Sequence, residues 1–162
     1  MNDREKFHDL LKQFGNTMLI THAADGTLHA RPMAMAEVEP NCDVWFLSGA
    51  DTAKAHEIET DTHAHLACQN DHSAYLSLSG TATVVRDAAK AAQLWREPYR
   101  VWFPGGKDDP DLVLIHFKPQ AGEYWDNAGL NKAKYMFEAV KAYVTGTRAH
   151  VEEGEQHGVV RF

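Results

Sequence analysis

The stretch from Thr17 to Lys54 constrains the fold most strongly, because it alternates apolar runs with strong turn signals. Apolar runs at 18–20 and 33–38 flank the segment Ala-Asp-Gly-Thr at 24–27. An Asp-Gly pair accepts the positive φ angles of a tight hairpin turn at little steric cost. A second turn, Glu-Pro-Asn, leads into the run Val-Trp-Phe-Leu, whose β-branched and aromatic residues are typical of a strand. The stretch therefore predicts a β-meander.

Residues that can bind an anion gather where this meander ends. Ser48, Thr52 and Lys54 follow the last predicted strand, and Arg31 lies on the preceding hairpin. A helix is predicted over 52–60, with Thr52 or the Asp before it as the N-cap. The N–H groups and the dipole at a helix N-terminus favour a phosphate. We expect these side chains to converge on one anion; the alternative is that Arg31 and Lys54 are ordinary solvated residues of a strand and a helix.

The remainder of the chain predicts further helices and strands around the meander. Helical spacing of apolar residues and capping residues predict helices over 3–14, 88–95 and 131–144. Apolar and β-branched runs, several of them alternating, predict strands over 63–69, 73–85, 112–117 and 122–126, with a turn at 70–72. Gly80 within one of these strands predicts a bend or bulge. Together the elements predict an α+β protein, mainly β, with an antiparallel barrel core of six to seven strands.

Length, charge and cysteine usage predict a single cytoplasmic domain. A chain of 162 residues suits one sizeable core over 1–162, with a polar tail at 146–162 that ends on a short strand at 159–160. The formal charge of −7 argues against nucleic acid or an anionic membrane as a partner. No apolar run is long enough to span a bilayer, and the charged start has no signal-peptide core. Two cysteines without a CxxC pair fit a reduced compartment.

Motifs for several other chemistries are weak or absent. The sequence contains no GxSxG, GxGxxG or Walker A motif. His63 and His65 share one face of a strand, but no third ligand has metal-site spacing, so no metal site is predicted. An acidic loop with Asp108, Asp109 and Asp111 lacks the calcium-loop pattern and predicts a turn.

A series of short motifs along the chain carries a resemblance to a known family. In order, the motifs are MLIT, DGTLHARPM, VWFLSGADTAK, YLSLSGTATVVRD, LW, VWFPGGKDDPDLVLI and EYWD. With this order and spacing, the sequence resembles the general stress protein 26 group of the pyridoxamine 5'-phosphate oxidase-like superfamily, the FMN-binding split barrels. The resemblance implies a split β-barrel with flanking helices and a homodimer with FMN at two sites along the subunit interface. FAD stays open as an alternative, because its extra half can project into solvent.

The resemblance also implies which residues contact the flavin. Arg31, Thr52 and Lys54 match residues that hold the flavin phosphate or ribityl chain, and charged donors suit such a dianion. Trp125 matches an aromatic residue that reaches the flavin from the partner subunit. The other matched residues lie along the ring or at its polar edge: Pro32, Met33, Leu47, Ser48 and, from the adjacent strand, Tyr75.

One departure from the family pattern concerns the substrate. Pyridoxamine-phosphate oxidases place an Arg-x-His type segment after their Glu-Phe-Trp motif, whereas this chain continues with Asp126 and Asn127. We therefore expect an FMN-dependent oxidoreductase of the stress response with an unknown small-molecule partner, and no synthesis of pyridoxal phosphate. No catalytic acid or base is predicted, although His29 and Tyr75 are candidates for facing the site. A flavin-sequestering protein without turnover and a heme-binding relative stay open as alternatives.

Overall fold

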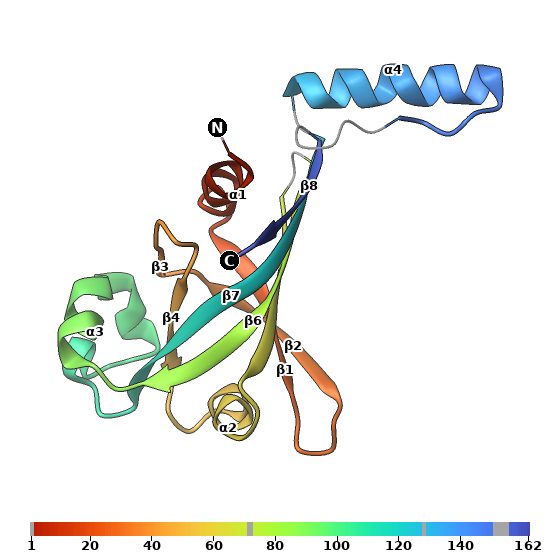
Figure 1. Cartoon of the computed structure of the whole chain (residues 1–162). Helices are drawn as coiled ribbons and strands as arrows, with labels where there is room; N and C mark the ends of the chain where they lie inside the picture. Colours follow the sequence, from red (N-terminus) through yellow and green to blue (C-terminus); the bar gives the residue numbers. More distant parts are fainter. Residues whose placement is uncertain (1, 71–72, 128, 151–155) are drawn as a thin grey trace.

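The computed structural model describes residues 2–70, 73–127, 129–150 and 156–162. Within them, one sheet has the strand order β2-β1-β5-β6-β7-β4-β3, and β8 pairs with β7 (Figure 1). All pairings are antiparallel. The strands are β1 (Asn16–His22), β2 (Leu28–Ala34), β3 (Glu37–Val38), β4 (Val44–Gly49), β5 (His63–Gln69), β6 (Ala74–Val85), β7 (Leu112–Asp126) and β8 (His157–Arg161). The predicted α+β class with an antiparallel split barrel is confirmed.

In the described residues, the helices at 3–11, 53–60 and 88–94 flank the sheet and begin at side-chain N-caps, and a longer helix projects away from it. They are α1 (Asp3–Leu11), α2 (Ala53–Thr60), α3 (Ala88–Leu94), α4 (Gly129–Thr145) and two 3-10 turns, η1 (Glu97–Val101) and η2 (Gly106–Asp108). Thr52 is the N-cap of α2, and its hydroxyl accepts a hydrogen bond from the Ala55 N–H. Asp87 caps α3 in the same way, through the Lys90 N–H. Each cap satisfies an N–H group that has no partner within its helix.

The strands predicted at 112–117 and 122–126 are one continuous strand, β7. Pro119 lies within it opposite Gly80, where the pairing of β6 with β7 shifts register between Ser79 and Gly80. A proline is tolerated at such an irregular position, because it has no N–H to donate to the ladder. The prediction of two strands was therefore wrong, whereas the predicted bulge at Gly80 is confirmed.

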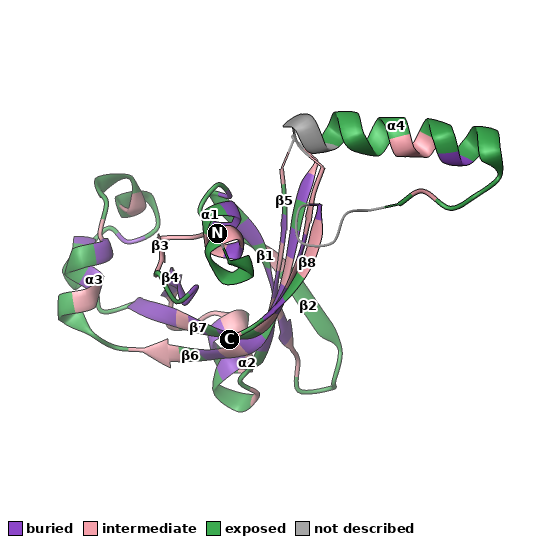
Figure 2. Ribbon diagram, turned by 45° about the horizontal axis from the view of Figure 1, so that its top comes forward, coloured by how far each residue is buried: buried purple, intermediate pink, exposed green. Residues whose placement is uncertain are grey.

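The larger core fills the space between the curved sheet, α1 and α2. Phe7 of α1 packs edge-on against Tyr124 and Phe162, with ring centroids 6.3 and 5.5 Å apart. A smaller apolar cluster lies under α3 and includes Trp45 and Phe103. Figure 2 shows the buried residues along the strands and on the sides of α1 and α3 that face the sheet. The residues that join β4 to α2, 50–53, are half-buried or exposed.

The C-terminal part of the chain leaves the sheet and then returns to it. Helix α4 projects away from the barrel, and most of its residues are exposed (Figures 1 and 2). Its exposed large apolar side chains are Tyr135, Met136, Phe137, Val140, Tyr143 and Val144. The helix predicted at 131–144 and the final strand are both confirmed, while the turn at 71–72 and the tail segment 151–155 lie outside the described residues. None of the helices in the described ranges is long and apolar enough to cross a membrane.

Both thiols are expected to be unreactive in the folded protein. Cys42 and Cys68 are free and buried, and burial raises the pKa of Cys42 to about 11 from an ordinary value of 9.0. Because the Cys42 thiol ionises less readily in the folded protein than in the unfolded chain, it contributes to the free energy of unfolding below pH 9.0. This contribution is lost as the pH rises from 9.0 towards about 11. Ellman's reagent at neutral pH should therefore detect both thiols only after denaturation. Rapid labelling of the native protein would contradict the placement of these residues.

Candidate functional site

A cavity of about 410 Å³ opens between the end of β4, strand β2, the start of α2 and the turn η1. Six of the residues predicted to contact the flavin line this cavity: Pro32, Met33, Leu47, Ser48, Thr52 and Lys54. They come from the two strands and the helix of the predicted meander, so the fold brings together residues up to 22 positions apart. A cavity of this size falls within the usual range for small-molecule sites.

One end of the cavity is polar and lies at the N-terminus of α2. Lys54 is half-buried there, and burial together with the Arg31 charge lowers the pKa of its amino group. The Lys54 side chain has no hydrogen-bond or ion-pair partner in the described part of the chain. The Thr52 hydroxyl donates to the Gly49 carbonyl at 2.9 Å. The buried Ser48 hydroxyl lies 3.3 Å from the Thr52 hydroxyl. A cation near a helix N-terminus, with two hydroxyls beside it, is suited to an anion.

The other wall of the cavity was not predicted from the sequence. Tyr99, Trp102 and Phe103 line it from η1 and the residues that follow, and Asp111 lines it from the loop before β7. Trp102 is 71% exposed, which is unusual for so large an apolar side chain. The only sequence signal was the cluster of aromatic residues between 99 and 103. Its position opposite β2 depends on tertiary packing, which no local pattern encodes.

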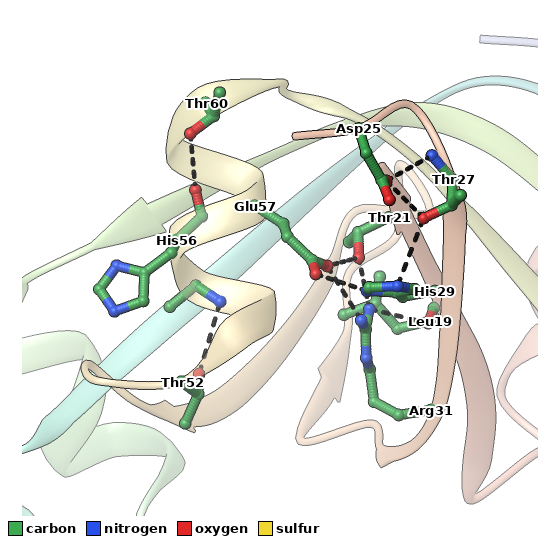
Figure 3. A network of polar contacts seen from close by, with 11 residues as sticks. Leu19, Thr21, Asp25, Thr27, His29, Arg31, Thr52, His56, Glu57 and Thr60 are labelled. Atoms are coloured by element: carbon green, nitrogen blue, oxygen red, sulfur yellow. Dashed lines mark hydrogen bonds and ion pairs between the residues drawn. The ribbon is translucent and has the colours of Figure 1, made fainter. Parts of the chain in front are cut away.

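Arg31 does not line the cavity but lies beside it, in a polar network between β1, β2 and α2 (Figure 3). Its guanidinium donates to the Glu57 carboxylate at 3.0 Å and to the Thr21 hydroxyl at 2.5 Å. His29, on the same face of β2, contacts the second oxygen of Glu57 at 2.7 Å. The sequence analysis did not identify Glu57 or Thr21, since a helix glutamate and a strand threonine carry no distinctive motif.

Tyr75 and Trp125 lie away from this cavity. They are directly opposite each other on β6 and β7, and the Trp125 ring stacks on His157 of β8, with centroids 5.5 Å apart. Tyr75 lines a second hollow together with Met18 and Pro32. Pro32 thus borders both this hollow and the cavity of about 410 Å³. Within one chain, Trp125 does not line that cavity.

The remaining histidine candidates have partners within the protein. The His63 ring contacts the Asp61 carboxylate at 2.8 Å, and the His65 ring contacts the Ser77 hydroxyl at 2.9 Å. Within the residues that the structure describes, no group of three or more His, Cys, Asp or Glu side chains is placed to hold a metal ion. The cavity between β2, β4, α2 and η1 is the hollow in which most of the predicted contact residues gather.

Comparisons with known proteins identify the family. The family described as pyridoxamine 5'-phosphate oxidase like matches residues 2–150. General stress protein 26 of Bacillus subtilis is 28% identical over 99 residues, which cover 59% of this chain and 69% of that protein. The resemblance predicted from the sequence is thereby confirmed.

Solved structures support the same relationship. A protein from Jannaschia sp. CCS1, provisionally named general stress protein 26, superposes with a TM-score of 0.73 and 26% identity, over 97% of this chain and 96% of that one. The general stress FMN/FAD binding protein of Xanthomonas citri superposes with a TM-score of 0.67 and 29% identity, over 78% of this chain and 89% of that one. The chain belongs to the pyridoxamine 5'-phosphate oxidase-like family.

Proposed function

We propose that this protein binds FMN in the cavity between β2, β4, α2 and η1 and acts as an FMN-dependent oxidoreductase on a small molecule. The observation that carries the proposal is the division of the cavity into a polar end, with the Lys54 cation, two hydroxyls and the Asp111 carboxylate that accepts from the Ala50 N–H, and an apolar wall. A flavin has the same division, because its phosphate is dianionic and its ring system is planar and largely apolar. The similar protein from Xanthomonas citri, described as FMN/FAD binding, supports this choice of ligand.

The residues of the polar end would hold the phosphate. Lys54 supplies a charged donor, and the first N–H groups of α2 lie at the same end of the cavity. The Thr52 and Ser48 hydroxyls donate to the Gly49 carbonyl in this structure and would donate to the phosphate by rotating away from it. Arg31 adds a second positive charge close enough to lower the pKa of Lys54. Arg31 is already paired with the Glu57 carboxylate, so a bound dianion would chiefly supply the counter-charge for Lys54.

The apolar wall would hold the ring. Pro32, Met33 and Leu47 provide one side, and the aromatic residues of η1 and of the two positions after it provide the other. Such a wall excludes water and fixes the orientation of the ring, which are the contributions that a protein makes to a cofactor reaction. When bound, the flavin would supply the hydride or electron transfer itself.

We further propose that the protein is a homodimer whose partner subunit completes the site through Trp125. Three apolar features that one chain leaves exposed support this proposal: Tyr75, Trp102 and the outer face of α4. Large exposed apolar surfaces commonly mark interaction sites, and an isologous interface would bury the same patch on both subunits. Light scattering after size exclusion should give twice the chain mass of 18.1 kDa. A monomer of 18.1 kDa would contradict the proposal.

Synthesis of pyridoxal phosphate is not part of the proposed function. The residues after Trp125, Asp126 and Asn127, offer no cationic donor for a substrate phosphate. A carboxylate at this place would leave such a phosphate uncompensated. A heme-binding function is less well supported than flavin binding, because the described residues that line the cavity include no His or Cys, and the possible axial ligands among them are Met33 and Tyr99.

Anaerobic reduction tests the oxidoreductase proposal. Purified protein loaded with FMN and desalted should lose its flavin absorption when NADPH is added, and regain it with an electron acceptor. Retained flavin that stays oxidised when NADPH or NADH is added would favour the alternative, a flavin-sequestering protein without turnover. Protein that instead retains heme and excludes flavin would overturn the proposal.

A further inference from the structure

Glu57 is the centre of a polar network that the cavity does not include. Its side chain is only 10% exposed, although it comes from the surface helix α2. One oxygen accepts hydrogen bonds from Thr21 and Arg31, at 2.5 and 3.0 Å, and the other contacts His29 at 2.7 Å (Figure 3). Burial raises the pKa of Glu57, but hydrogen bonds from Thr21, His29 and Arg31 outweigh this effect and lower it. The side chain is therefore a carboxylate at neutral pH.

The network fixes one end of the Arg31 guanidinium. One terminal amino group donates to the Thr21 hydroxyl at 2.5 Å and to the Leu19 carbonyl at 3.3 Å, and the other donates to Glu57. The Thr21 hydroxyl in turn donates to Glu57, which closes a ring of three side chains. Thr21 is fully buried and only 21% of the Arg31 side chain is exposed, so solvent screens these contacts weakly.

On the opposite edge of the Arg31 guanidinium, two N–H donors have no acceptor among the described residues. An arginine has five N–H donors in a planar fork, and the contacts to Leu19, Thr21 and Glu57 use three of them. The Nε hydrogen and the second hydrogen of the amino group facing Glu57 have no acceptor in the described ranges. Because Nη2 and the Nε hydrogen lie on the same side of the planar group, these two donors form a side-on fork. Such a fork binds a phosphate through two parallel hydrogen bonds.

We propose that Glu57 is a positioning residue for the flavin phosphate, acting through Arg31. Together with Thr21, it holds the end of the guanidinium so that the side-on fork stays available to the anion. This inference rests on the proposed function. Arg31 shares one face of β2 with Met33, which lines the cavity together with Lys54, so the guanidinium lies on the cavity side of the strand. Its charge also lowers the pKa of Lys54.

Arginine held in advance loses less conformational freedom on binding than a free side chain would. Removing Glu57 should therefore lower the affinity only for ligands that carry a phosphate. Riboflavin, which shares the ring and ribityl chain of FMN but lacks the phosphate, is the matched ligand. The ratio of the two dissociation constants isolates the phosphate contribution from any general loosening of the cavity.

The test measures FMN and riboflavin affinity by fluorescence quenching for a set of variants. Glu57→Ala should lower the preference for FMN over riboflavin by about 10-fold, the usual weight of one charge-assisted contact. Glu57→Gln should keep most of that preference, because the amide oxygen can still accept from Arg31. In an Arg31→Ala background, Glu57→Ala should cause no further loss, since its proposed effect passes through Arg31.

A second variant keeps the proposal testable if Glu57→Ala does not fold, as judged by circular dichroism. Thr21→Val has nearly the same shape but removes the hydroxyl between Arg31 and Glu57, and it should also lower the FMN preference. An unchanged or increased preference in Glu57→Ala or Thr21→Val would overturn the proposal and indicate that the carboxylate competes with the phosphate. Wild-type protein that binds neither ligand, or binds both equally, would instead overturn the proposed phosphate site itself.

Discussion

Replacing Arg31 and Lys54 together with alanine is expected to weaken FMN binding by about 3–6 kcal/mol, roughly 10²- to 10⁴-fold, while riboflavin affinity changes little. The reason is that both cations are proposed to donate charge-assisted hydrogen bonds to the phosphate, which riboflavin lacks. Lys54 lines the cavity and Arg31 lies within electrostatic reach of it. Isothermal titration calorimetry with both ligands measures the two affinities directly.

A matched control separates local contacts from net charge. Lys12 and Arg86 are exposed and do not line the cavity, so replacing both with alanine removes the same charge elsewhere. This control should bind FMN with an affinity within about twofold of the wild type, since distant exposed charges are screened by salt. An Arg31 and Lys54 double variant with unchanged FMN affinity would mean that the phosphate lies elsewhere.

Gly80→Ala is expected to destabilise the fold by about 3 kcal/mol or more, because the bulge leaves no room for a side chain. A Cβ at this position would lie 2.1 Å from the Lys118 carbonyl oxygen and 2.9 Å from the Phe117 ring. The carbonyl belongs to the backbone of β7, so it cannot move without disturbing the pairing of the two longest strands. In a protein of this size, the melting temperature should fall by roughly 10 °C.

Gly15→Ala provides the control for this variant. A Cβ there would meet no atom within 4 Å, and alanine restricts the unfolded chain more than glycine does. Its melting temperature, measured by differential scanning calorimetry, should equal or slightly exceed that of the wild type. If Gly80→Ala were as stable as Gly15→Ala, the register shift between β6 and β7 would be wrong.

The elements that sequence alone predicts well are those with local signals. The hairpin of β1 and β2 follows from its Asp-Gly turn, and α2 follows from its N-cap Thr52, which accepts a hydrogen bond from Ala55 as expected. The same locality explains why six of the predicted flavin contacts share one cavity. They lie on consecutive elements of one meander, so their convergence needs little knowledge of the rest of the fold.

The parts that sequence did not predict depend on contacts between distant segments. Pro119 suggested the end of a strand, and only the bulge opposite it, at Gly80, explains why β7 continues. The aromatic wall from η1 approaches β2 through tertiary packing, and the partners of Arg31 come from both β1 and α2. A basic residue on a strand suggested a phosphate contact, but its hydrogen bonds to Glu57 and Thr21 could not be predicted from spacing.

The most direct test of the central claim is an absorption spectrum of the purified protein after incubation with excess FMN and desalting. The account predicts retained flavin at about one molecule per chain, because the polar and apolar ends of the cavity match those of the cofactor. A folded protein, shown by circular dichroism, that retains no flavin would contradict the account.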